Sequence, residues 1–162
     1  MASDLAPVDL GFLASAQHTV TREMRIAAPP EKVFDAFARD PAGWGLWFPG
    51  FSRSGRYVTA PPHGAGAERE MRIAGIRVVE TVLAWEEPSR WAFRVSSAAV
   101  PFLRAMVEDY RFTPHAAGTL FTWTAAFDGT GPMKFGGGAV GTAVCAVVAR
   151  AARNLERRLQ AG

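Results

Sequence analysis

Residues 18–27 show the first clear pattern along the chain, because apolar side chains there fall at alternate positions. Val20, Met24 and Ile26 all occupy even positions and so share one face of an extended chain. This alternation predicts a β-strand, which the proline pair at positions 29 and 30 then ends.

Two short helices are expected after this strand. Proline is tolerated in the first helical turn, and Val33, Phe34 and Phe37 follow the proline pair at helical spacing. A proline disfavours helical geometry in the residue before it, so the first helix should end near Asp40. Residues 44–50 then crowd aromatic side chains ahead of a proline and a glycine, which predicts a second short helix that closes one end of a core.

Six further strand-like runs follow, and proline and glycine residues separate them. The runs cover residues 55–59, 67–74, 76–85, 90–97, 105–113 and 119–128. Short strands joined by tight turns indicate an antiparallel meander rather than alternating βαβ units.

The last part of the chain changes to a helical period. Apolar residues recur at a spacing of three to four as far as Leu155 and Leu159, while Arg153 and Arg157 fall on the opposite side. The pattern predicts a helix over residues 137–160, which at ~1.5 Å per residue would be about 36 Å long. That length is sufficient to cross a whole curved sheet.

These elements together predict an α+β protein with a helix-grip fold. An antiparallel sheet that buries one face needs a cover, and the long C-terminal helix is the one predicted element with sufficient length. We therefore expect a curved antiparallel sheet of about six to seven strands wrapped around that helix, with two short helices after the first strand. Residues 17–162 should form this single domain, and residues 1–16, which show no clear period, should form a flexible N-terminal arm.

Composition and charge fit one globular domain and argue against several classes of function. The 162 residues are 49% hydrophobic and 20% charged, and the net charge is only +3. The local basic excess is confined to the end of the last helix, so we expect no nucleic-acid partner. These residues are Arg150, Arg153, Arg157 and Arg158.

Metal, cofactor and membrane signals are also weak. The single cysteine, Cys145, allows neither an internal disulfide nor a zinc cluster built on thiolates. Residues 136–141 match G-x-G-x-x-G but lack the βαβ context of a dinucleotide site, so these glycines should let an entrance loop bend. The longest uncharged apolar stretch, residues 135–149, is shorter than the ~20 residues of a membrane span, and no Lys or Arg precedes Arg22. We expect a cytoplasmic monomer or homodimer with no metal or other cofactor.

Several short stretches carry a family resemblance. They read Ala-Pro-Pro-Glu-Lys-Val-Phe at 28–34, Trp-Gly-Leu-Trp-Phe-Pro at 44–49, Val-Glu-Thr-Val at 79–82, Trp-Ala-Phe-Arg at 91–94 and Gly-Thr-Leu-Phe-Thr-Trp at 118–123. In this order they resemble the polyketide cyclase/dehydrase branch of the START-like (SRPBCC) superfamily, which has the birch-pollen-allergen fold. The resemblance implies an internal pocket for a hydrophobic small molecule but no single activity, because members include polyketide cyclases and carriers of lipids and hormones.

Two carboxylates fall on strand faces that we expect to point inward. Glu80 lies two residues from Val82, and Glu108 lies two residues from Tyr110. An unpaired carboxylate among apolar side chains has a raised pKa, as a general acid or base near neutral pH requires. We therefore regard Glu80, Glu108 and Tyr110 as catalytic candidates. The alternative is that the carboxylates form structural ion pairs with Arg69, Arg72 or Arg94.

The chain is rich in aromatic residues, with five tryptophans and eleven phenylalanines. Most must belong to the core, but some should line a pocket, where flat walls suit a planar apolar ligand. The expected ligand-binding residues are Trp47, Phe93, Phe102, Tyr110, Phe121, Trp123, Val144 and Val148. The loop at 96–104 is expected to act as a lid beside the glycine-rich segment.

Three functions are compatible with these patterns. The leading hypothesis is a protein that binds a hydrophobic, polycyclic or polyketide- or lipid-like small molecule in an internal pocket. The alternative is a cofactor-independent cyclase, aromatase or dehydratase in which the pocket carboxylates move protons. The third is a protein-interaction module that uses the basic end of the last helix.

Overall fold

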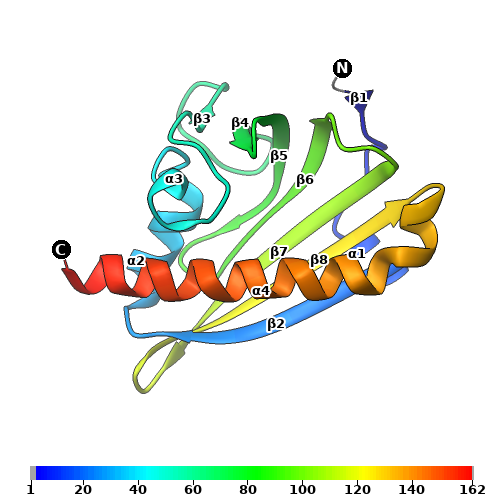
Figure 1. Ribbon diagram of the computed structural model, residues 1–162. Coiled ribbons are helices and arrows are strands. Elements are labelled where there is room, and N and C mark those ends of the chain that lie inside the picture. Colours follow the sequence, from blue (N-terminus) through cyan, green and yellow to red (C-terminus); the bar gives the residue numbers. More distant parts are fainter. Residues whose placement is uncertain (1–2, 162) are drawn as a thin grey trace.

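A strongly curved antiparallel sheet wraps around one long helix in the computed structural model, which describes residues 3–161 (Figure 1). The strands are β1 (Ser3–Asp4), β2 (His18–Ile26), β3 (Arg56–Tyr57), β4 (Glu68–Ile73), β5 (Ile76–Glu86), β6 (Arg90–Ala98), β7 (Leu103–His115) and β8 (Gly118–Gly129). The helices are α1 (Phe12–Ser15), α2 (Pro30–Phe34), the π-helical turn η1 (Asp35–Arg39), α3 (Trp44–Trp47) and α4 (Pro132–Ala161).

The strand order is β2-β8-β7-β6-β5-β4-β3, with β1 added to β6, and every pairing is antiparallel. The first long strand, β2, therefore lies beside the last strand, β8. A meander of hairpins runs from β3 to β8, as the turn signals in the sequence predicted. The predicted helix-grip fold is confirmed.

Helix α4 begins earlier than the sequence predicted. It starts at Pro132 rather than near residue 137, so the glycine-rich segment forms helical turns and not the expected entrance loop. Glycine disfavours a helix by only about 1 kcal/mol per residue. Met133 and Val140 both line an apolar cavity beneath these turns, and such contacts offset that cost.

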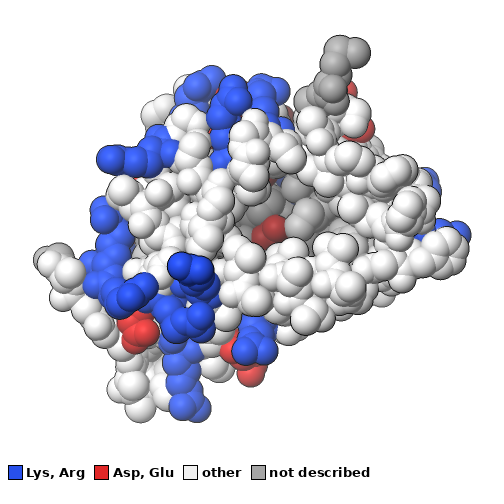
Figure 2. Space-filling view, viewed as in Figure 1, with Lys and Arg blue, Asp and Glu red and all other residues white. Residues whose placement is uncertain are grey.

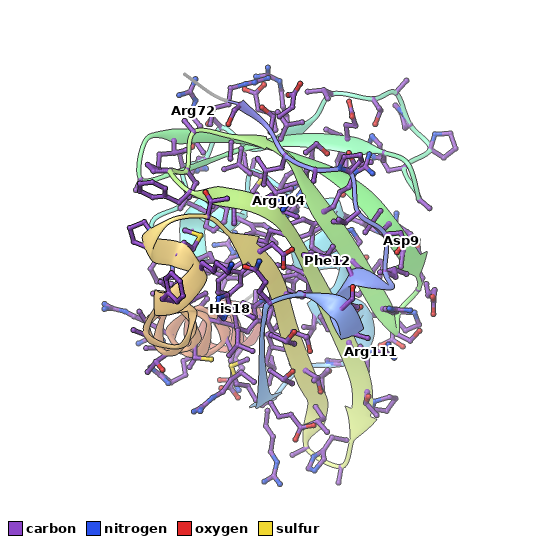
Figure 3. All side chains as sticks on the ribbon, turned by 90° about the vertical axis from the view of Figure 1, so that its right-hand side faces the viewer. Asp9, Phe12, His18, Arg72, Arg104 and Arg111 are labelled. Atoms are coloured by element: carbon purple, nitrogen blue, oxygen red, sulfur yellow. The ribbon has the colours of Figure 1, made fainter. Side chains whose placement is uncertain are left out.

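Of the N-terminal segment, which was expected to be a flexible arm, the structure describes residues 3–16, and most of their apolar side chains pack on the face of the sheet opposite α4. Strand β1 of this segment pairs with the end of β6, at Ser3 with Ala98. Phe12 of α1 is buried in a small cluster with Val107 and Ala126, and Figure 3 shows Phe12 lying against the sheet on the side away from α4. The segment packs there because it buries apolar surface on a sheet face that α4 does not cover.

The core is densest where α2, η1 and α3 meet the sheet. The ring of Phe37 lies 4.9–5.6 Å from five other aromatic rings. They belong to Trp44, Trp47, Tyr110, Phe112 and Phe121. Large side chains pack closely at this end, and the two apolar cavities under α4 lie farther toward its N-terminal half.

Among the described residues, no helix combines the length and the apolar character needed to cross a membrane.

Candidate functional site: an apolar cavity under the long helix

A cavity of about 270 Å³ lies between α4 and the concave face of the sheet. Figure 2 shows it as a hollow above α4, with acidic atoms at its floor and uncharged residues around it. Its apolar lining consists of Trp44, Phe48, Pro49, Phe51, Ile73, Phe93, Ala143, Val144, Val147 and Val148. Its polar lining consists of Glu80, Glu108, Tyr110 and Trp123, which we call the polar end.

Strand alternation and register place the polar end. Glu108 and Tyr110 are two residues apart on β7 and therefore point to the same, concave face. Antiparallel pairing sets Phe93 of β6 opposite Glu108, and Trp123 of β8 opposite Tyr110. Three neighbouring strands thus bring these side chains together under α4.

Glu80 is not an unpaired carboxylate, because it forms a buried ion pair with Arg69 of β4. The two residues are directly opposite in the β4–β5 pairing, and their side chains are 3% and 0% exposed. The Arg69 guanidinium also donates to the carbonyl of Phe37 at 3.2 Å and lies 4.2 Å from the ring centroid of Trp91. Burial raises the pKa of Glu80, and the adjacent guanidinium opposes that rise.

Glu108 has neutral partners instead. Its Oε2 atom accepts hydrogen bonds from the hydroxyl of Tyr110 and, at 2.8 Å, from the indole N–H of Trp123. Burial raises the pKa of Glu108, while these two hydrogen bonds and the charge of Arg69 oppose the rise. The pKa of Tyr110 is also raised, by burial and by the neighbouring Glu108, so Tyr110 remains a neutral donor.

A second cavity of about 180 Å³ continues toward the beginning of α4. Trp123 and Val144 line both cavities and form the partition between them. The remaining lining is wholly apolar: Val20, Val100, Leu103, Met106, Ala125, Phe127, Met133, Val140 and Gly141. Together the two spaces reach the few hundred Å³ typical of ligand pockets.

Of the eight residues expected to bind ligand, five line the larger cavity: Phe93, Tyr110, Trp123, Val144 and Val148. Trp47 and Phe121 are instead packed into the aromatic core around Phe37. Phe102 is 53% exposed on the turn before β7. The three catalytic candidates, Glu80, Glu108 and Tyr110, all lie at the polar end, although Glu80 is engaged by Arg69.

Several lining residues were not expected from the sequence. Val20 and Met106 occupy inward positions of their strands, so alternation could have found them. Phe48, Phe51 and Ile73 lie at the ends of short elements or in loops, where no periodicity indicates which way a side chain points.

The other chemical candidates of the sequence lie elsewhere. His18 and Cys145 line a groove of about 520 Å³ between β2 and α4. His63 stacks on Tyr57 with ring centroids 4.0 Å apart. His115 is exposed beside the β7–β8 turn. Within residues 3–161, no three His, Cys, Asp or Glu side chains gather closely enough to hold a metal ion.

A curved sheet that grips a long C-terminal helix over an apolar cavity is the helix-grip architecture. Comparison with known proteins specifies this further. The chain belongs to the polyketide cyclase/dehydrase and lipid transport family, whose model matches residues 17–160.

Individual related proteins are similar to this chain in sequence or in fold, but their names give little functional detail. An uncharacterized protein of Mycobacterium tuberculosis, Rv2574, is 33% identical over 129 residues, which cover 78% of this chain and 75% of that protein. The crystal structure of Ara h 8.0201 matches with a TM-score of 0.73 and 17% identity, covering 90% of this chain and 99% of that one. A START superfamily protein from Mycobacterium smegmatis matches with a TM-score of 0.72 and 15% identity over 88% of this chain and 97% of that one. At such identities the structural matches establish the fold.

Proposed function

We propose that this protein binds a hydrophobic, polycyclic or polyketide- or lipid-like small molecule in the space under α4. The observation that carries the proposal is the cavity itself, which is apolar except at one end and adjoins a second, wholly apolar space. Transfer of an apolar molecule from water into such a space is favourable by about 25 cal/mol per Å² of buried apolar surface.

The shape of the lining favours a flat ligand. Phe93 and Tyr110 are stacked with an interplanar angle of 26°, and Trp123 stands at the boundary of the two cavities. Aromatic walls of this kind pack well against planar rings. The polar end offers a hydrogen-bonding position for one polar group of the ligand.

The proposal can be tested by blocking the cavity. Val144→Trp should fill the partition between the two spaces, because Val144 lines both. The neutral fluorescent probe N-phenylnaphthylamine should bind the wild-type protein and lose at least about tenfold in affinity in this variant. Ala146→Trp places the same side chain on an exposed position of the same helix and should leave the affinity unchanged. Equal binding by both variants would contradict the proposal.

A second candidate function is a cofactor-independent cyclase, aromatase or dehydratase. The contact between Glu108 and Tyr110 favours it, because a carboxyl group with a raised pKa beside a neutral phenol can exchange protons with a bound substrate. Native mass spectrometry of freshly purified protein should reveal a bound molecule. Conversion of that molecule by the wild type and not by Glu108→Gln would support catalysis. If the wild-type protein leaves the bound molecule unchanged, the result would support a carrier.

A further inference from the structure

The distribution of polar groups under α4 restricts the chemistry of the ligand. The second cavity offers only apolar side chains, whereas all four polar side chains of the first cavity lie together at its polar end. A ligand that spans both spaces must therefore be apolar along most of its length. Any polar group it carries should sit where it can reach Glu80, Glu108 or Tyr110.

The two carboxyl oxygens of Glu108 differ in their hydrogen bonds. Oε2 accepts from both Tyr110 and Trp123, whereas Oε1 has no hydrogen-bonding partner among residues 3–161. Glu108 lines the cavity and is only partly buried, so we infer that its unengaged oxygen, Oε1, can meet a ligand there. Trp123 can only donate, and its N–H is already used on Oε2.

The charges around Glu108 favour its uncharged form. Arg69 is the one cation, within the described part of the chain, that acts on both carboxyl groups of the polar end. It forms a close ion pair with Glu80, so its charge is already balanced. An ionised Glu108 would then be an unbalanced charge beside an apolar cavity, which is strongly unfavourable. The raised pKa of Glu108 agrees with this charge balance.

We propose that Glu108 is the polar anchor of the cavity and that, as an uncharged acid, it donates a hydrogen bond from Oε1 to a neutral ligand with a carbonyl-type oxygen. The inference rests on the proposed function, because it assigns the class of ligand for the same cavity. It favours neutral ketones, aldehydes, esters or quinones with an apolar body. It disfavours carboxylates and sulfonates, since neither Glu80 nor Glu108 offers compensating positive charge.

The test uses two neutral probes of nearly equal shape. Prodan is a flat naphthyl ketone, and its analogue with a methylene group in place of the carbonyl lacks the acceptor. At mildly acidic pH the wild-type protein should bind prodan about tenfold more tightly than the analogue, the effect of one hydrogen bond to a buried group. This ratio should fall toward one at alkaline pH, as Glu108 ionises and loses its donor.

Glu108→Gln is the matched variant. Its amide can accept from Tyr110 and Trp123 through oxygen and donate to the ligand through nitrogen, and it does not titrate. The variant should therefore keep the preference for prodan at every pH. The other groups that face this site are Arg69, Glu80 and Tyr110, and α4 contributes only Ala143, Val144, Val147 and Val148 to the lining. All of these groups are unchanged in the variant.

The outcomes separate this inference from the proposed function. A wild-type ratio near one, a ratio that does not change with pH, or a Glu108→Gln variant that titrates like the wild type would overturn the role of Glu108. Probe binding that Val144→Trp abolishes would still support the cavity in each of those cases. Failure of both probes to bind, or binding that survives Val144→Trp, would overturn the proposed function itself.

Discussion

At the scale of single residues, the two carboxyl groups of the polar end differ in their partners and therefore in their roles. Glu80 is fully buried against Arg69, whose guanidinium lies 4.4 Å from the ring centroid of Trp44 and 4.2 Å from that of Trp91. Arg69 thus joins β4, β5 and the aromatic core. Glu108 forms no ion pair with any residue that the structure describes, so we expect it to be the carboxyl group that responds to a ligand.

Removing one member of the buried pair should be costly. Arg69→Met leaves Glu80 without its partner, so we expect the free energy of unfolding to fall by about 3–5 kcal/mol at neutral pH. The loss should shrink as the pH falls, because a protonated Glu80 needs no cation. Urea denaturation at several pH values measures both effects.

Two controls separate pairing from packing. The double variant Arg69→Met, Glu80→Met should recover much of the stability, because a hydrophobic pair of similar volume is often as stable as a buried ion pair. Arg56→Met breaks an ion pair with Glu70 at an arginine that is 63% exposed, and it should cost at most about 1 kcal/mol. A double variant no more stable than Arg69→Met alone would argue against the ion-pair interpretation.

The sequence predicts the inward direction of these carboxyl groups but not their partners. Alternation along β5 and β7 was sufficient to place Glu80 and Glu108 on buried faces. The partner of Glu80 remained open among three arginines, because only the register between β4 and β5 sets Arg69 directly opposite it. Register depends on pairing between strands, which a single strand's pattern does not encode.

At the scale of elements, α4 combines two unlike halves. Its C-terminal half buries Val148, Ala151 and Leu155 in the core, while its N-terminal half is rich in glycine and lies over the second cavity. The helical period of the C-terminal half made this helix predictable. The glycines obscured its beginning, because their low helix propensity resembles a loop signal even where contacts from the rest of the fold maintain the helix.

Gly136 and Gly138 weaken the first turns of α4, and no close approach of another residue requires glycine at either position. A Cβ atom added at Gly136 or Gly138 would meet nothing within 4 Å, and neither residue has a positive φ angle. Gly136→Ala and Gly138→Ala should each raise the free energy of unfolding by about 0.5–1 kcal/mol. Gly45→Ala is the contrasting variant, because its Cβ would lie 2.5 Å from the Ser52 carbonyl carbon and should destabilise the protein. Chemical denaturation distinguishes them, and a loss of stability in the α4 variants would contradict this account.

At the scale of the whole molecule, the sheet separates two layers, although Leu5 of the N-terminal segment packs in the main core. Its concave face carries α4 and the cavities, and its convex face carries the N-terminal segment (Figures 1 and 3). Consecutive residues of β7 serve both layers, since Val107 packs toward Phe12 while Glu108 faces the cavity. The order of elements predicted the concave layer. The convex layer was not predicted, because the sequence of residues 1–16 shows no period and the described part, residues 3–16, buries only a few side chains.

This separation predicts that stability and ligand binding can be changed one at a time. Phe12→Ala removes the main buried side chain of the convex layer and should lower the free energy of unfolding by about 3 kcal/mol. Its affinity for N-phenylnaphthylamine should stay within about twofold of the wild type, because no residue of α1 lines either cavity. Val144→Trp should show the opposite behaviour, with lost binding and a retained fold. Denaturation curves and probe titrations of the same samples decide this, and a weaker probe affinity in folded Phe12→Ala would mean that the sheet transmits changes from one face to the other.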